Sequence, residues 1–146
     1  MSGKIFIGFK GKNNASCILV KSISADSYLL TNSFEGLKRD IESLSCSYDS
    51  VILFGIDKSL TDKVRIEKVA ELDTKYYSVL NLENMSKQLE AVGISNYLSD
   101  KPTHYLCNAA YWYLLRKFNG KAVLIHIPSI KSFNIQLIDN LKLVLR

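Results

Sequence analysis

Three residues far apart in the chain have the chemistry of a nucleophile, a base and an acid that orients the base. Cys107 lies at the start of a segment with helical character, where free backbone N–H groups and the helix dipole favour the attacking thiolate. His126 interrupts an apolar segment just before a proline, and an imidazole there could take a proton from a thiol and return one to a leaving amine. Glu67 could fix the tautomer of that imidazole and stabilise its protonated form.

Each of these residues also has a purely structural interpretation. Most free cysteines behave as small buried hydrophobic residues, and a histidine in a strand can be satisfied by backbone hydrogen bonds. Glu67 is flanked by Arg65 and Lys68, which is typical of an exposed carboxylate. His104 is an alternative base, although its place just before Cys107 favours a role in shaping the loop. Taken one at a time, the residues leave these alternatives open.

The elements that would position these residues follow a strand–helix–strand pattern. Lys4–Phe9 and residues 51–55 are short apolar runs that predict buried strands. Between them, Asn32 or Ser33 caps a helix whose apolar residues recur at helical spacing, namely Phe34, Leu37, Ile41 and Leu44. This pattern indicates a mostly parallel sheet covered by helices, a three-layer α/β/α sandwich in one domain spanning residues 1–146.

The remaining segments complete this α/β arrangement. Helices are predicted at Ala15–Ile23 with Asn14 as cap, at 85–92, at 104–118 and from Ser132 onward. Strands are predicted at Ser27–Leu30, 76–80 and Ala122–Ile127, and residues 94–103 are expected to form a loop. Residues 63–72 fit a strand or a helix equally well. Gly55 and Ile56 then fall at the carboxyl end of a core strand, where α/β sheets place their ligands.

Composition excludes several classes of protein. No apolar run approaches the length of a membrane span, and the N-terminal apolar stretch is too short for a secretory signal, so we expect a cytoplasmic protein that does not bind membranes. The three cysteines do not form a disulfide framework or a metal-binding spacing, and no metal or organic cofactor is expected. The net charge of +5 comes from scattered lysines, which favours a solvated basic surface over a nucleic-acid site.

Three motifs in order resemble the pyroglutamyl peptidase I (pyrrolidone-carboxylate peptidase) family. Tyr105-Leu106-Cys107-Asn108 resembles the family's nucleophile motif, and Leu124-Ile125-His126-Ile127-Pro128 resembles its histidine motif. Ile66-Glu67-Lys68-Val69-Ala70 resembles its Glu-Arg-Val-Ala segment, which carries the acidic member of the triad. The first strand with its Gly8-Phe9, Asn14-Ala15-Ser16, Ser33-Phe34-Glu35 and the strand ending at Gly55 also match in order, so the resemblance covers essentially the whole chain.

The resemblance implies a thiol peptidase that removes an N-terminal pyroglutamyl group from a small peptide with a blocked N-terminus. Cys107, His126 and Glu67 would then be the triad, and the substrate-binding residues would be Phe9, Gly55 and Ile56. Family members often assemble as oligomers, which allows a homo-oligomer here.

This sequence also departs from the family. Lys12 stands where an aromatic residue would help hold the lactam ring, which leaves open a hydrolase for another small acyl amide or ester. The regions between motifs are short, which leaves open a non-catalytic binding or assembly domain with a remnant site.

Overall fold

The computed structural model describes residues 3–12, 14–23, 26–129 and 135–146. Its helices are α1 (Ala15–Ile23), α2 (Phe34–Glu42), α3 (Leu82–Ala91), α4 (Tyr105–Lys117) and α5 (Ile135–Leu145). Its strands are β1 (Lys4–Phe9), β2 (Ser27–Leu30), β3 (Ser50–Ile56), β4 (Lys63–Glu67), β5 (Val69–Glu71), β6 (Lys75–Tyr77), β7 (Ser95–Ser99) and β8 (Ala122–Ile127).

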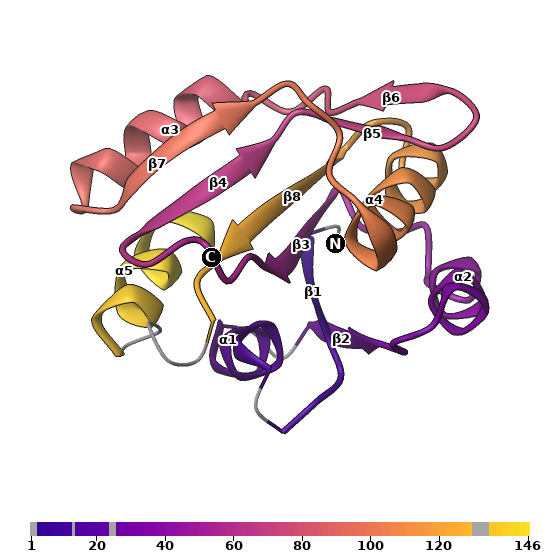
Figure 1. Ribbon diagram of the computed structural model, residues 1–146, viewed down its shortest axis with the longest axis horizontal. Coiled ribbons are helices and arrows are strands. Elements are labelled where there is room, and N and C mark those ends of the chain that lie inside the picture. The colour runs from indigo at the N-terminus through magenta and orange to yellow at the C-terminus, as the bar shows by residue number, and fades with distance from the viewer. Residues whose placement is uncertain (1–2, 13, 24–25, 130–134) are drawn as a thin grey trace.

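The central sheet has the strand order β2-β1-β3-β8-β4-β7. The pairs β1–β2, β1–β3 and β3–β8 are parallel, whereas β4 runs antiparallel to β8 and parallel to β7. Helices α1, α3 and α5 lie on the left of the sheet in Figure 1, and α2 and α4 lie on the right. The α/β fold with a mostly parallel sheet predicted from the sequence is therefore confirmed.

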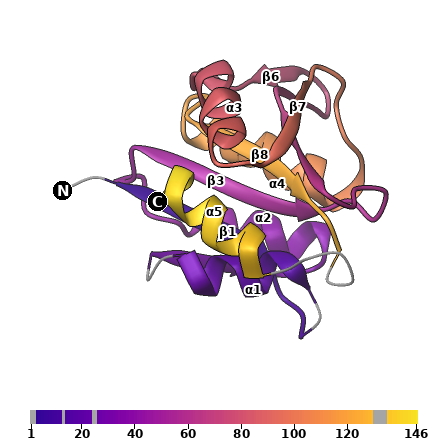
Figure 2. The ribbon, with the colours of Figure 1, turned by 90° about the vertical axis from the view of Figure 1, so that its left-hand side faces the viewer.

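Strand alternation divides the core into two layers, one on each face of the sheet. On β3, Leu53 faces the layer under α2 and α4, whereas Ile52 and Phe54 face the layer under α1, α3 and α5. Figure 2, turned to look onto the left-hand side of Figure 1, shows α5 in front of the strands. Because both faces are covered, β3 and β8 are buried along almost their whole length and read as continuous apolar runs.

Local signals in the sequence explain most helix starts. The side chain of Ser33 accepts a hydrogen bond from the Gly36 N–H at 3.1 Å and caps α2, as predicted. Asn14 accepts a hydrogen bond from the Ser16 N–H at 2.9 Å at the start of α1. The helix expected at 85–92 begins earlier, because Asn81 caps it by accepting from the Asn84 N–H at 3.0 Å.

Several sequence predictions need correction. Residues 94–103 are not all loop, because 95–99 form the strand β7. This strand lies at the edge of the sheet, so it does not need the continuous apolar sequence of a buried strand. The undecided segment 63–72 forms β4 and β5. The strand expected at 76–80 is β6 (75–77), which forms a two-stranded sheet with β5. Phe34 is 57% exposed and does not join the apolar face of α2.

The expected start of the last helix at Ser132 lies outside the described residues, and α5 is described from Ile135. Within the described part of the chain, no helix is long and apolar enough to cross a bilayer.

Candidate active site

A row of paired residues on β3, β8, β4 and β7 forms the floor of the site. Gly55 pairs with His126, His126 pairs with Arg65, and Arg65 pairs with Tyr97. Directly paired residues in neighbouring strands point to the same face of a sheet. For this row it is the face covered by α4, which carries Cys107. Strand pairing therefore brings residues from four separate segments together beneath the start of one helix.

Glu67 lies behind the imidazole of His126. The Glu67 Oε2 atom is 2.7 Å from His126 Nδ1, and the two side chains are 1% and 3% exposed. A carboxylate is only an acceptor, so His126 donates its Nδ1–H to Glu67. That tautomer leaves the lone pair on Nε2 free to act as a base.

Gly55 makes room for both the thiol and the imidazole. A Cβ atom at position 55 would lie 2.7 Å from Cys107 Sγ and 3.2 Å from His126 Nε2. The sulfur and the nitrogen thus approach the same small volume above Gly55 from two directions, the sulfur from α4 and the nitrogen from β8. The structure therefore brings together all three residues that the sequence singled out.

Hydrogen bonds fix helix α4 to β4, which carries Glu67, and to the neighbouring β5. The hydroxyl of Tyr111 donates to the backbone carbonyl of Glu67 at 2.7 Å, and both groups are buried. One turn earlier, the amide of Asn108 accepts from the Glu71 N–H at 3.0 Å and donates to the Glu71 carbonyl at 2.7 Å. These bonds fix the position of α4, and therefore of Cys107, relative to Glu67 on β4.

The protonation state of Cys107 differs from the one that its helix position predicts. The pKa of the Cys107 thiol is raised to about 11, mainly by burial and in addition by the nearby Glu67 and Asp57 carboxylates. The backbone N–H of Ile56, which donates to the sulfur, and the charge of Arg65 only partly offset this. The start of the helix is therefore not sufficient to make a thiolate, and a pKa this high leaves the Cys107 thiol neutral near pH 7.

Arg65 is the site residue that the sequence interpretation missed. Its Nε donates to Glu67 Oε2 at 2.5 Å, and its Nη1 donates to Asp57 Oδ2 at 2.7 Å. In the sequence, Arg65 reads only as a charge that flanks a surface carboxylate. A strand assignment would have revealed it, because residues two apart in a strand share a face, and Arg65 and Glu67 are two apart.

The predicted substrate-binding residues lie around this floor. Phe9 is buried in the core layer under α4, two residues beyond the paired Ile7 and Leu53, at the level of Gly55. Ile56 is partly exposed at the end of β3, and its backbone N–H hydrogen-bonds the Cys107 sulfur. Lys12 is exposed, and no hydrogen bond or ion pair joins it to a described residue. His104 is also exposed and precedes α4 without a side-chain capping bond.

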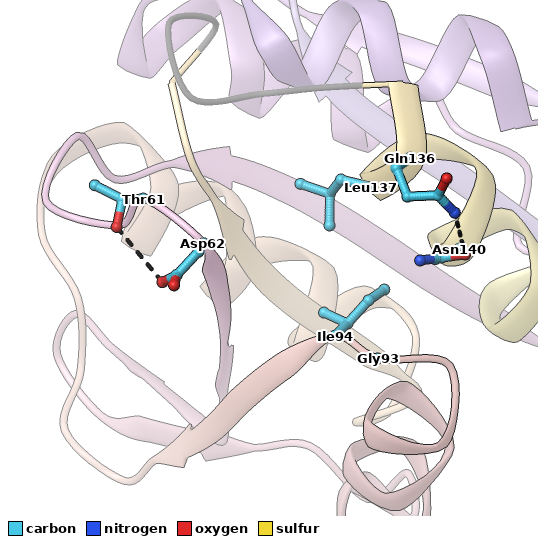
Figure 3. A pocket seen from close by; sticks show the side chains of 7 residues that line it. All are labelled: Thr61, Asp62, Gly93, Ile94, Gln136, Leu137 and Asn140. Atoms are coloured by element: carbon cyan, nitrogen blue, oxygen red, sulfur yellow. Dashed lines mark hydrogen bonds between the residues drawn. The ribbon is translucent and has the colours of Figure 1, made fainter.

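A cavity of 220 Å³ lies away from this floor, between the loop before β4, the turn before β7 and α5 (Figure 3). Its polar side chains are engaged with one another, Thr61 with Asp62 at 3.5 Å and Gln136 with Asn140 at 3.1 Å. In the described part of the chain, no three His, Cys, Asp or Glu residues are placed to hold a metal ion.

Comparisons with known proteins identify the same fold. No protein-family model and no curated protein sequence matches the chain. Solved structures match it over almost its whole length. The pyrrolidone carboxyl peptidase from Thermococcus litoralis aligns with a TM-score of 0.79 at 20% identity, covering 99% of this chain and 92% of that one.

Two further structures agree. The enzyme from Thermus thermophilus gives a TM-score of 0.80 at 15% identity, covering 97% of this chain and 98% of that one. The enzyme from Pyrococcus furiosus gives a TM-score of 0.76 at 16% identity, covering 97% of this chain and 94% of that one. The chain therefore has the fold of the pyrrolidone carboxyl peptidases, as the resemblance of its motifs predicted.

Proposed function

We propose that this protein is a cysteine hydrolase that removes an N-terminal pyroglutamyl group from peptides. Cys107 would be the nucleophile, His126 the base and then the acid, and Glu67 the residue that orients the imidazole. The observation that carries the proposal is the convergence of Cys107 Sγ and His126 Nε2 above Gly55, with Glu67 2.7 Å behind the ring. The shared fold with pyrrolidone carboxyl peptidases supports the choice of substrate.

The neutral thiol determines the order of proton transfer. As Sγ bonds to the scissile carbonyl carbon, Nε2 of His126 takes the thiol proton and the carbonyl oxygen becomes an oxyanion. The imidazolium that forms is stabilised by the Glu67 carboxylate. When the oxyanion collapses, the C–N bond breaks and His126 gives its proton to the leaving amine, which leaves a thioester on Cys107.

Hydrolysis of the thioester would use the same groups in reverse. His126 takes a proton from water as the water oxygen attacks the thioester carbonyl, and the C–S bond then breaks with return of that proton to sulfur. The acyl product leaves as a carboxylic acid. The backbone N–H of Ile56, which hydrogen-bonds the sulfur, would be a donor to the oxyanion.

Turnover of a pyroglutamyl-coumarin amide tests the proposal. We expect hydrolysis by the unchanged protein, loss of turnover in Cys107→Ala and His126→Ala, and a strong decrease in Glu67→Gln. Cys46→Ser is the matched control, because Cys46 is an exposed cysteine outside the site and its replacement should leave the rate unchanged. A properly folded protein that does not cleave this amide would reject pyroglutamyl specificity.

The alternative of another small acyl substrate loses its main argument. It rested on Lys12 as a cation near the acyl group, but Lys12 is exposed and makes no described contact with the triad. A panel of other acyl-coumarin amides covers this alternative. Turnover of one of them, with the same dependence on Cys107 and His126, would keep the chemistry and change the substrate.

A further inference from the structure

Arg65 is held between two carboxylates at the edge of the site. Its Nε donates to Glu67 Oε2 at 2.5 Å and its Nη1 donates to Asp57 Oδ2 at 2.7 Å. The other oxygen of Asp57 accepts from the N–H and the hydroxyl of Ser59, at 2.9 and 2.6 Å. The guanidinium is therefore fixed at both ends, and its side chain is only 16% exposed.

The backbone brings Arg65 to His126. The two residues are direct partners in the β4–β8 pairing, and Arg65 Nη2 lies 3.2 Å from His126 Nδ1. Since both nitrogens carry hydrogens in the tautomer that donates to Glu67, this short distance is a contact between donors and not a hydrogen bond. Arg65 therefore acts on the imidazole through Glu67, whose Oε2 accepts from both side chains.

The buried carboxylate of Glu67 needs the positive charge of Arg65. A carboxylate that is 1% exposed requires compensation by charge or hydrogen bonds, and a neutral imidazole supplies one hydrogen bond and no charge. Arg65 supplies the missing positive charge before any proton has moved. The planar guanidinium can also bond two carboxylates in different directions at once, which a lysine ammonium on a flexible stem does less well.

The titratable groups around the imidazole come from three elements. Glu67 and Arg65 on β4 and the Cys107 thiol on α4 lie next to the imidazole, and Asp57, on the loop after β3, pairs with Arg65. Asp57, Arg65 and Glu67 together carry one net negative charge. Arg65 thus orients the carboxylate, and Asp57 offsets the repulsion that a lone guanidinium would exert on an imidazolium.

We infer that Arg65 is a positioning residue for this reaction, an inference that rests on the proposed function. It holds Glu67 Oε2 on His126 Nδ1 and, through Asp57, fixes the loop that follows Ile56. The N–H of Ile56 contacts the Cys107 sulfur, so one side chain couples the carboxylate behind the base to the backbone beside the nucleophile. Arg65 itself does not touch the thiol or the acyl group.

The first test compares Arg65→Lys and Arg65→Gln on the pyroglutamyl-coumarin amide. We expect both to lower kcat by about 10²-fold, the cost of misplacing catalytic groups by roughly 1 Å, with KM unchanged. Added guanidinium at a non-denaturing concentration should restore part of the rate of Arg65→Gln. The matched control is Arg39→Gln, since Arg39 is exposed on α2 and its loss should change neither constant.

The second test needs no substrate. The His126 Nδ1 proton, held in a buried hydrogen bond to Glu67, should give a downfield proton resonance in the NMR spectrum of the unchanged protein. We expect this resonance to be lost or displaced in Arg65→Lys and Arg65→Gln and retained in Arg39→Gln. If Arg65→Gln does not fold, Asp57→Asn frees one end of the guanidinium and should cause a smaller decrease in kcat and a smaller displacement.

These readouts separate the two proposals. A folded Arg65→Gln protein with unchanged kcat and an unchanged resonance would overturn the role of Arg65. If Arg65→Gln does not fold, unchanged kcat and an unchanged resonance in Asp57→Asn would overturn it instead. If the unchanged protein does not cleave the amide, the proposed function fails. The resonance would still decide whether Arg65 holds Glu67 on His126.

Discussion

Replacing Gly55 by alanine tests the geometry of the site through stability alone. The added methyl carbon would lie 2.7 Å from Cys107 Sγ, about 1 Å closer than non-bonded heavy atoms normally pack. The thiol or the helix must move, and overpacking of this kind costs about 1–3 kcal/mol. A glycine in a strand with ordinary dihedral angles would otherwise gain about 0.4–1 kcal/mol on replacement by alanine.

Whether Gly55→Ala lowers or raises the free energy of unfolding should therefore depend on the presence of the Cys107 sulfur. We expect Gly55→Ala to destabilise the protein by about 1–3 kcal/mol when Cys107 is present. In the Cys107→Ala background the same change should be close to neutral or stabilising, because only the 3.2 Å contacts with the His126 ring remain. The coupling between the two positions would then be about 1–3 kcal/mol, within the range observed for residues in direct contact.

Equilibrium unfolding in urea measures all four members of this cycle. The single tryptophan, Trp112, is buried on α4 with its ring centroid 5.0 Å from that of Tyr76, so its fluorescence should report unfolding. Activity of Gly55→Ala should also fall by about 10²-fold if the thiol is displaced by 1 Å. Equal effects of Gly55→Ala with and without the sulfur would show that Cys107 does not lie above Gly55, and the proposed site would be wrong.

Three further predictions concern the groups around this contact. In a Cys46→Ser protein, alkylation of Cys107 by iodoacetamide should accelerate about tenfold per pH unit and level off only near pH 11, because burial raises the pKa of this thiol to about 11; a plateau near neutral pH would indicate a preformed thiolate. Tyr111→Phe should lower the free energy of unfolding by about 1–3 kcal/mol, because the buried Glu67 carbonyl loses its donor, and Tyr113→Phe on the same helix is the control. The pKa of Asp57 is lowered from 3.8 to about 2, because hydrogen bonds from Ser59 and Arg65 outweigh the opposing effect of burial. Its contribution of up to about 2 kcal/mol is therefore present above pH 4 and lost as the pH falls to 2, and urea titrations should show a weaker loss over that range in Asp57→Asn.

Continuous apolar runs and helix caps could be recognised in the sequence because their signals are local. The runs that form β1, β3 and β8 are buried on both faces, and the cap at Ser33 needs only residues three apart. The edge strand β7 could not be recognised, because residues 95–99 lack an apolar pattern and are held by pairing with β4. The reversed direction of β4 was also unpredictable, since residues 63–72 fit two kinds of structure.

The candidate site shows the same division between local and long-range information. Residue types and the order of motifs singled out Cys107, His126 and Glu67, because each motif is a short segment of the chain. Nothing in the segments themselves placed Arg65 beside His126, since that contact depends on the antiparallel register of β4 on β8. The protonation of Cys107 was likewise mispredicted from its position at the start of a helix.

Residue types and local patterns are enough to identify the groups that could react and the segments that form most of the buried strands and helices. How those groups meet, and how their surroundings shift their pKa values, depends on the folded molecule. Register is set by pairing between strands distant in sequence, and burial depends on every element packed around a side chain, so neither property is encoded in any single segment. The thiol above Gly55 and the guanidinium between Asp57 and Glu67 are both consequences of that packing.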